Sequence, residues 1–409
     1  MAESAAGPCI SCGKSPLTPV LHLGTTPLAN ALLSEQQLRV PEPRFPLDLR
    51  FCKSCSLVQI TEKLPPERLF GEYAYFSSFS DTIVAEAKKL AARLTRERKL
   101  DRSSLVVEVA SNDGYLLQHY RDAGVPVLGI EPAANIAKVA NERGIRTRCE
   151  FFGRDVAERL AGEGLRADVL HANNVLAHVP DLNGFVSGIT ALLKPRGVAV
   201  IEVPYVRDLI EKCEFDTIYH EHLCYFSVTA LESLFRRHGL GLAAIERIPV
   251  HGGSLRLLAA RGAEAGPSTR VLMDEERAAG MLEHRYYAGF AERVEALRVK
   301  LRALLSRLKS EGKRVAAYGA SAKGSTLLNY FGIGAAELEY VVDRSTEKQG
   351  RFTPGTHLRI LPPAQLLADQ PDYVLLLTWN FMDEIAAQQA EYRARGGKFI
   401  VPIPDVRVV

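Results

Sequence analysis

The chain has 409 residues, enough for two to four domains that each bury a hydrophobic core. Its 47% hydrophobic and 24% charged residues match an ordinary globular protein and exclude collagen-like, disordered and coiled-coil chains. The net charge is only +3, from 51 Lys and Arg against 48 Asp and Glu, and the basic residues form no stripe, so nucleic-acid binding is not indicated.

The sequence contains no membrane or export signal that we recognise. No apolar run approaches the roughly 18 residues that a membrane span needs, and the start, MAESAAGPCISCG, lacks a basic segment followed by an apolar one. We therefore expect a cytoplasmic, monomeric protein of enzyme size that binds no membrane.

The N-terminal stretch is rich in proline and turn residues and ends at Leu64-Pro65-Pro66. It has too few apolar repeats to fold without an added cross-link such as a bound metal ion. It holds two Cys-x-x-Cys pairs, formed by Cys9, Cys12, Cys52 and Cys55. Four thiolates beside turn residues suit a tetrahedral zinc ion, which with sulfur in every ligand position would be structural. Reduced thiols or a redox pair are the alternative. We expect a zinc-binding module over residues 1–66.

From Leu105 onward, short β-branched runs alternate with helical stretches, which is typical of βαβ units in a parallel sheet. The expected strands of this first α/β domain (67–265) are 105–109, 127–130, 167–170 and 198–201. A charged amphipathic stretch over 271–312 predicts one long helix or a helical pair. A connector and second α/β domain (266–409) follow, with strands expected at 314–318, 340–342, 373–378 and 398–401.

The first domain carries two features of an adenosyl-ligand site. Its first strand runs into Ala110-Ser111-Asn112-Asp113-Gly114, and the next strand ends in Gly129-Ile130-Glu131-Pro132, with Glu131 where ribose hydroxyls are bound. The turn lacks the three glycines of dinucleotide sites, and Asp113 would repel phosphate but suit a sulfonium. S-adenosylmethionine is therefore favoured over NAD, and an acidic turn without a ligand is the alternative. Glu108 reaches the methionine ammonium or faces solvent.

Acid–base residues are dense in one expected loop of this domain. Two histidines, a glutamate and two tyrosines fall within the seven positions Tyr219–Tyr225, which favours catalysis over packing. His-x-His can also bind a metal, but no third ligand is apparent nearby. His178 follows a strand and precedes a helix, where it faces the same cleft or serves as a cap.

The second α/β domain begins with a strand, a turn bracketed by Gly319 and Gly324, and a helix start. Backbone amides and the helix dipole can bind phosphate in such a turn, and Lys323 adds charge. Asp343 closes the next strand, so a nicotinamide and a nucleotide sugar fit this pattern equally well. A purely structural turn is the third alternative.

Taken together, these motifs resemble the three-domain sugar C-methyltransferases that act on nucleotide-linked 4-keto deoxysugars, such as the C-3'-methyltransferases of antibiotic deoxysugar pathways. The similarity runs nearly end to end, through the cysteine quartet, Glu72–Ser78, Glu108–Gly114, Gly129–Pro132, Asn174–Pro180, Tyr219–Ser227, His251–Ser254, Gly319–Gly324 and Val342–Arg344.

This resemblance implies a zinc-binding module, a central Rossmann-like class I methyltransferase domain that binds S-adenosylmethionine, and a C-terminal Rossmann-like domain. The sugar nucleotide would lie between the latter two. The cofactor residues expected by motif position are Glu108, Ala110, Asn112, Asp113, Gly114, Glu131, Pro132 and Asn174. The expected substrate-binding residues are Tyr75, Phe76, Ser77, Ser321, Lys323 and Asp343.

Methylation of a carbon beside a ketone requires a base within about 3 Å of the departing hydrogen and a donor for the enolate oxygen. The resemblance implies His222 as the base, with Glu221 and His178 orienting it and Tyr219 near the keto oxygen, whereas spacing alone does not choose among the histidines. A thymidine nucleotide (dTDP) and methylation at C-3' are the family expectation.

Two other functions stay open at this point. An NAD-dependent nucleotide-sugar oxidoreductase is favoured by Gly319–Gly324 together with Asp343. A non-enzymatic zinc-ribbon scaffold that binds nucleotide sugars or nucleic acid is the second alternative.

Overall fold

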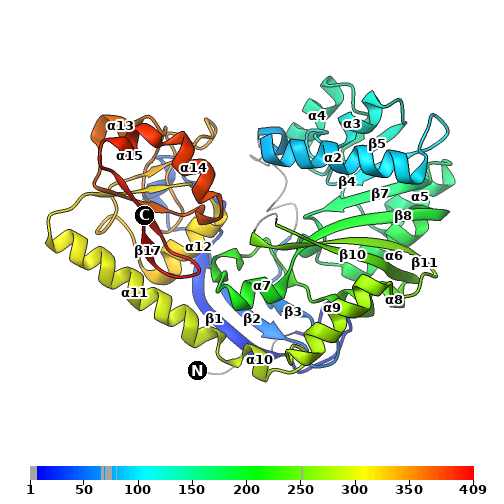
Figure 1. The fold of residues 1–409 in the computed structure, drawn as a ribbon, viewed down its shortest axis with the longest axis horizontal. Helices are drawn as coiled ribbons and strands as arrows, with labels where there is room; N and C mark the ends of the chain where they lie inside the picture. Colours follow the sequence, from blue (N-terminus) through cyan, green and yellow to red (C-terminus); the bar gives the residue numbers. More distant parts are fainter. Residues whose placement is uncertain (1–6, 66–68, 70–75, 80, 250–251) are drawn as a thin grey trace.

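The protein was analysed as a computed structural model that describes residues 7–65, 69, 76–79, 81–249 and 252–409. Its named strands form three sheets, one for each predicted part of the chain. Figure 1 shows the two α/β domains as the arms of a V, with strands β1 to β3 across its base and helix α11 along the outside of one arm. The predicted α/β class with a small N-terminal module is confirmed.

The N-terminal module is a small antiparallel sheet in the order β1-β2-β3-β9. Its elements are β1 (Thr18–Pro27), η1 (Gln37–Arg39), β2 (Arg44–Phe51) and β3 (Val58–Ile60), completed by β9 (Cys224–Tyr225) from the central domain. The module is more regular than its composition suggests, because Leu47, Leu49 and Phe51 alternate on one buried face of β2.

The central domain is built on a seven-stranded sheet in the order β10-β11-β8-β7-β4-β5-β6. The five strands β8, β7, β4, β5 and β6 run parallel to one another. Strands β11 and β10 continue the sheet beyond β8 as an antiparallel edge, which the sequence patterns did not indicate. The elements are η2 (Ser77–Phe79), α2 (Asp81–Arg98), β4 (Val106–Val109), α3 (Leu117–Asp122), β5 (Val127–Ile130), α4 (Ala134–Glu142), β6 (Thr147–Arg148), α5 (Arg154–Gly162), β7 (Ala167–Asn173), η3 (Leu176–His178), α6 (Leu182–Leu192), β8 (Leu193–Pro204), α7 (Val206–Glu211), η4 (Phe215–Thr217), α8 (Val228–Arg237), β10 (Leu240–Ile248) and β11 (Ser254–Arg261).

The connector is interrupted where one long helix or a helical pair was expected. It consists of α9 (Pro267–Ala278), α10 (Arg285–Ala288) and α11 (Phe290–Ser310). Helix α9 ends just before Gly280, whose φ of 77° lies in the left-handed region that ends helices. None of the described helices combines the length and apolarity that crossing a bilayer requires.

The C-terminal domain has a second, largely parallel sheet in the order β14-β13-β12-β15-β16-β17. Its elements are β12 (Val315–Tyr318), α12 (Ala322–Phe331), β13 (Val341–Val342), β14 (Ile360–Leu361), α13 (Gln365–Asp369), β15 (Tyr373–Leu376), η6 (Trp379–Phe381), α14 (Met382–Gln388), α15 (Ala390–Ala394), β16 (Lys398–Val401) and β17 (Arg407–Val408). Chain order reverses at β12, as it does at β4 in the central sheet, and such positions bind ligands beyond the strand ends.

The segment from η4 to β9 lies where the three domains meet. The Phe215 ring stacks on Phe331 of α12 with centroids 4.8 Å apart, and the Trp379 indole N–H donates to the buried Asp216 carboxylate over 2.7 Å. At the other end of the segment, β9 pairs with β3 of the N-terminal module. The expected acid–base loop is therefore held between two neighbouring domains.

Candidate functional site

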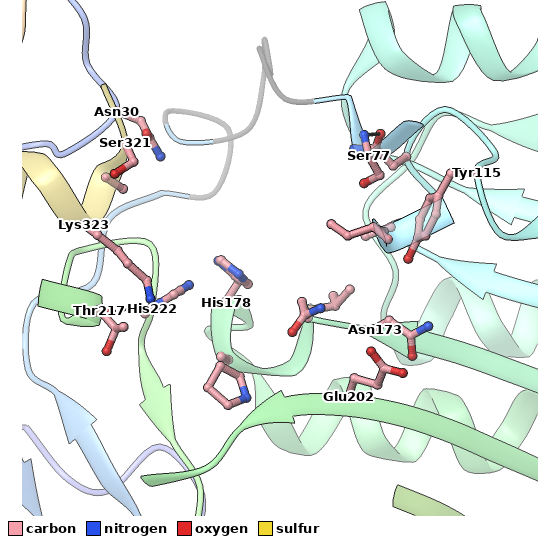
Figure 2. Close-up of a pocket in the computed structure, with 18 of the residues that line it drawn as sticks. Asn30, Ser77, Tyr115, Asn173, His178, Glu202, Thr217, His222, Ser321 and Lys323 are labelled. Carbon is pink, nitrogen blue, oxygen red and sulfur yellow. Dashed lines mark hydrogen bonds between the residues drawn. The ribbon is translucent and has the colours of Figure 1, made fainter. Parts of the chain in front are cut away.

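A cavity of about 1820 Å³ lies between the arms of the V and is lined by residues of all three domains. A pocket for one drug-sized ligand has about 300–1,000 Å³, so this cavity has room for two. The carboxyl ends of β4, β5, β7 and β8 form one wall, and the start of α12 forms part of the opposite wall. Figure 2 shows His222 and Lys323 on one side, Asn173 and Glu202 on the other, and His178 between them.

The His222 imidazole is held in a defined tautomer by two partners from its own loop. Its Nδ1 lies 2.8 Å from the Thr217 carbonyl oxygen, and its Nε2 lies 2.8 Å from the Tyr219 hydroxyl. Since a carbonyl oxygen only accepts, Nδ1 carries the hydrogen and Nε2 is the basic atom that accepts from Tyr219. His222 and Tyr219 both line the cavity.

His178 lies beside His222, with the ring centroids 4.7 Å apart in an edge-on arrangement. Burial lowers the pKa of His178 to about 4, although a hydrogen bond with the Glu221 backbone opposes this shift. His178 is therefore neutral near pH 7 and offers packing and a ring edge to His222 rather than a positive charge.

Glu221 and His220 point away from the cavity toward the N-terminal module. The Glu221 carboxylate is 5% exposed and accepts from the Asn30 amide over 2.7 and 2.9 Å. Burial raises the pKa of Glu221 to about 7, against the Asn30 hydrogen bond, which lowers it. The buried His220 has its Nε2 3.1 Å from the Pro46 carbonyl oxygen. Of the three candidate histidines, His222 and His178 line the cavity and His220 does not.

The turn after β4 opens its backbone toward the cavity. Ala110, Asn112 and Gly114 adopt φ angles of 51°, 49° and 81°, and a Cβ added at Gly114 would lie 2.7 Å from the Ile145 side chain. The two Glu131 carboxylate oxygens accept the N–H groups of Asn112 and Ala133, each over 2.9 Å, which ties this turn to the end of β5. The predicted cofactor residues that line the cavity are Ala110, Asn112, Glu131, Pro132 and Asn174.

Three predicted cofactor residues, Glu108, Asp113 and Gly114, do not line the cavity. Asp113 was expected to face a sulfonium, but its side chain is fully buried and accepts from the Arg143 guanidinium over 2.8 Å and from the Ser78 hydroxyl. Its charge is thus balanced by Arg143. Glu108 is 1% exposed, and burial together with the neighbouring carboxylates of Glu131, Asp113 and Glu202 holds its pKa well above the usual range.

The wall formed by the C-terminal domain carries positive charge at the start of α12. The Ser321 hydroxyl accepts the Gly324 N–H over 3.1 Å as the N-cap, and the Lys323 ammonium lies 5.1 Å from the centre of the Trp379 ring. Asp343 accepts from the N–H groups of Ala320 and Ser345, each over 2.8 Å, and so shapes the turn. Predicted residues Ser321, Lys323 and Asp343 line the cavity, as do Lys348 and Arg351.

Of the substrate residues predicted before α2, Phe76 and Ser77 line the opposite wall of the cavity. The Ser77 N–H donates to the Asn112 side-chain oxygen over 2.9 Å, so η2 contacts the turn after β4 directly. Tyr75 lies outside the described residues.

Comparisons with known proteins decide the family. Family models match residues 9–70 as "Putative zinc binding domain", 83–245 as "Methyltransferase domain" and 249–404 as "C-methyltransferase C-terminal domain". C-methyltransferase NovU from Streptomyces niveus is 39% identical over 404 residues, which cover 98% of this chain and 96% of NovU. This chain belongs to the C-methyltransferase family.

Other similar proteins match smaller shares of the chain. A ubiquinone biosynthesis O-methyltransferase from Rhodopseudomonas palustris is 27% identical over 96 residues, 24% of this C-methyltransferase and 38% of that protein. The crystal structure of magnesium protoporphyrin IX methyltransferase from Synechocystis with bound SAH covers 44% of this chain and 83% of its own at 15% identity, with a TM-score of 0.36. A likeness at that score adds nothing to the family assignment.

The C-methyltransferase uses S-adenosylmethionine, and the residues at its central strand ends fit this cofactor. Ala110, Asn112 and Asn174 turn their backbone to the cavity through left-handed φ angles, beside the Glu131 carboxylate. The side-chain oxygen of Asn173 is buried on this wall and has no hydrogen-bond partner among the described residues, so it can accept from a ligand. The prediction of this cofactor is confirmed.

The cysteine quartet fits a structural zinc ion. The Sγ atoms of Cys9 and Cys55 and those of Cys12 and Cys52 are 3.6 Å apart, and all four lie within 4.8 Å of one another. A tetrahedral ion with Zn–S bonds of about 2.3 Å requires S···S distances of about 3.8 Å. With four sulfur ligands the ion has no open position, so its contribution is to hold β1, β2 and β3 together.

Several cavity residues of this C-methyltransferase were not found from the sequence. Tyr115, Phe151, Asn173, Glu202 and Asn30 all line the cavity. Asn173 and Glu202 are paired at the carboxyl ends of β7 and β8, and Phe151 follows β6. Applying the strand-end rule to β7 and β8, and not only to β4 and β5, would have indicated Asn173 and Glu202, whereas β6 was not expected from the sequence. Asn30 carries no such signal.

Proposed function

We propose that this C-methyltransferase methylates a nucleotide-linked 4-keto deoxysugar at a carbon next to the ketone, with C-3' of a dTDP sugar as the expected position. The observation that carries the proposal is that His222, whose Nδ1 is held by the Thr217 carbonyl so that Nε2 is the basic atom, lines the same cavity as the cofactor residues. We take residues 67–265 as the methyltransferase unit and 266–409 as the connector and sugar-nucleotide domain.

His222 acts as the base in this proposal. Its Nε2 takes the proton from the carbon next to the ketone, and the C–H electron pair moves into the enolate. The Thr217 carbonyl accepts the Nδ1–H over 2.8 Å, which fixes the tautomer and stabilises the imidazolium that forms. His178 packs edge-on against His222 and, being neutral, does not oppose protonation by charge.

Tyr219 is the proposed donor to the substrate oxygen. Without substrate its hydroxyl donates to His222 Nε2 over 2.8 Å. When the keto oxygen enters, the hydroxyl turns to it, which frees Nε2 and provides a donor for the developing enolate charge. S-adenosylmethionine supplies the methyl group as an electrophile to the enolate carbon. The chain's own contribution to that step is to align both ligands in one cavity.

The start of α12 is the proposed site for the nucleotide diphosphate. This ten-residue helix presents its N-terminus to the cavity, and Lys323, Lys348 and Arg351 line the same region. The Lys323 ammonium is buried and has no hydrogen-bond partner among the described residues, so a phosphate oxygen would supply the missing acceptor. Because family membership extends over the full chain, neither the NAD-dependent oxidoreductase nor the non-enzymatic scaffold is retained.

The test is hydrogen exchange of candidate substrates in deuterated water. A panel of 4-keto nucleotide sugars is incubated with enzyme and S-adenosylhomocysteine, which allows proton abstraction without methyl transfer. We expect deuterium to enter one position next to the ketone. When S-adenosylmethionine replaces S-adenosylhomocysteine, a methyl group should appear at that same position. His222→Asn should lower the exchange rate by at least about 100-fold.

A matched control is His284→Asn. His284 is half-buried, bonds the Pro19 carbonyl oxygen and does not line the cavity, so this variant should exchange like the wild type. Methylation of an oxygen or nitrogen, or full exchange in His222→Asn, would refute the proposal.

A further inference from the structure

The N-terminal module holds the loop that carries His222 on both sides of this histidine. After it, the Ile60 N–H donates to the Leu223 carbonyl over 3.0 Å, and β3 pairs with β9 through Val58–Tyr225 and Gln59–Cys224. Before it, His220 Nε2 bonds the Pro46 carbonyl over 3.1 Å. β3 begins three residues after Cys55, so the zinc site and the loop are joined by one short stretch of chain.

Asn30 adds a side-chain contact at the residue directly before His222. Asn30 lies between β1 and η1, and its Nδ2 donates to both carboxylate oxygens of Glu221, over 2.7 and 2.9 Å. These residues are 191 positions apart in the chain. A donor shared by both oxygens fixes the position of the carboxylate, and in the ionised form of Glu221 this hydrogen bond is of the stronger, charge-assisted kind.

The position of Glu221 determines the surroundings of both cavity histidines. Its backbone bonds the His178 ring, and the next peptide unit carries His222, whose ring packs edge-on against His178. The Glu221 side chain is 5% exposed, so without Asn30 a buried carboxylate would lose a donor, and the loop would have to move to give it water. A displacement of about 1 Å at a reacting group can cost about 100-fold in rate.

We propose that the zinc-binding module is a positioning element of the active site, and that Asn30 is the positioning residue through which it holds Glu221 and, with it, His178 and His222. The module's role is thus to keep the base loop in its reactive arrangement, in addition to its own folding. This inference rests on the proposed function for the role of His222.

The test compares Asn30→Ala with Asn183→Ala. The Asn183 amide also joins the central domain to the N-terminal module, by donating to the Ser11 carbonyl over 3.0 Å, but Asn183 does not line the cavity. We expect Asn30→Ala to lower the rate of substrate hydrogen exchange by about 10- to 100-fold and to leave the Kd for S-adenosylhomocysteine within about twofold of the wild type. Asn183→Ala should leave both quantities near their wild-type values.

Two further measurements separate positioning from a loss of stability. Amide hydrogen exchange of peptides over 217–225 should increase in Asn30→Ala and not in Asn183→Ala. The Glu221 carboxyl, followed by carbon NMR, should change its titration in Asn30→Ala: upward if the group stays buried without the donor that favours its ionised form, and toward the ordinary value if the loop moves to give it water. Asn30→Ser keeps a hydrogen-bond donor and should be more active than Asn30→Ala. Asn30→Asp should be the least active of the three variants, because it places a carboxylate directly against that of Glu221.

Unchanged amide exchange over 217–225 and an unchanged Glu221 titration in Asn30→Ala would overturn the proposal. Equal effects of Asn30→Ala and Asn183→Ala on every quantity would do the same, because they would indicate a structural role alone. If wild-type enzyme exchanges no deuterium into any 4-keto sugar, the proposed substrate is wrong, and the amide-exchange and titration measurements still decide whether Asn30 positions the loop.

Discussion

The buried carboxyl of Glu221 makes folding stability depend on pH in a way that one substitution removes. Its pKa rises from an ordinary 4.5 to about 7 because it is buried. A group whose pKa is raised in the folded state stabilises that state fully below its unfolded pKa, and this contribution is lost as pH rises through the folded value. Glu221→Gln keeps an oxygen that accepts from Asn30 but has no proton to lose.

The magnitude follows from the two pKa values. At about 1.4 kcal/mol for each tenfold change in proton affinity, the step from 4.5 to about 7 makes ionisation about 3.5 kcal/mol less favourable in the folded protein than in the unfolded chain. Between pH 5 and pH 8 the expected loss is about 2.5 kcal/mol, because the unfolded group is already partly ionised at pH 5. Wild type should therefore lose about 2.5 kcal/mol more unfolding free energy across this range than Glu221→Gln.

Urea unfolding of both proteins at pH 5, 6.5 and 8 measures this difference. Comparing the two at each pH cancels the titration of all other groups, including the zinc ligands. Glu97→Gln, at an exposed position on α2, controls for the loss of one negative charge. If the wild-type and Glu221→Gln curves run parallel, Glu221 is not a buried acid with a raised pKa, and the account of its surroundings fails.

Three further substitutions test the cofactor turn and the zinc site. Arg143→Gln leaves the buried Asp113 carboxylate without its cation, so unfolding free energy should fall by about 2 kcal/mol and S-adenosylhomocysteine should bind more weakly in calorimetry. Gly114→Ala puts a Cβ 2.7 Å from the Ile145 side chain at a φ of 81°, which should lower stability by about 1–3 kcal/mol. Because Ile145 is itself buried, relief of the clash should appear in thermal unfolding as Gly114→Ala costing less in an Ile145→Ala background than in the wild type. Cys55→Ala removes one of four thiolates, so zinc content by atomic absorption should fall below one ion per chain and amide exchange should rise in β1 to β3.

The fold could be predicted largely because its strands are encoded locally. The runs at 127–130 and 398–401 match β5 and β16 residue for residue, since both are short buried strands of parallel sheets, which read as continuous apolar runs. Strand β9 could not be found in this way. Its two residues, Cys224 and Tyr225, become a strand only by pairing with β3, which lies more than 160 positions earlier in the chain.

The same distinction between local and distant information applies to the site. His220 and His222 are two residues apart in one loop, and sequence spacing gave no reason to prefer either. In the structure His220 points to the Pro46 carbonyl and His222 to the cavity, because the N-terminal module packs on one side of the loop. For Asp113 the local signal was misleading. Its position at a strand end predicted a contact with the ligand, but its carboxylate is paired with the guanidinium of Arg143, which lies thirty residues away in the chain.

In the proposed reaction, base, substrate and methyl donor must keep fixed distances, although different domains would bind them. One continuous core cluster joins the parts concerned, since it contains Val109 of β4, Ile60 of β3, Leu223 beside β9 and Phe331 of α12. Closely packed interiors resist deformation. The distance from the His222 loop to the cofactor turn is therefore set when the three domains fold together, and the short contacts of Asn30, Trp379 and Ile60 only have to fix the loop locally. This explains how the proposed base, although it lies on an irregular segment, can be aligned without a regular element beneath it.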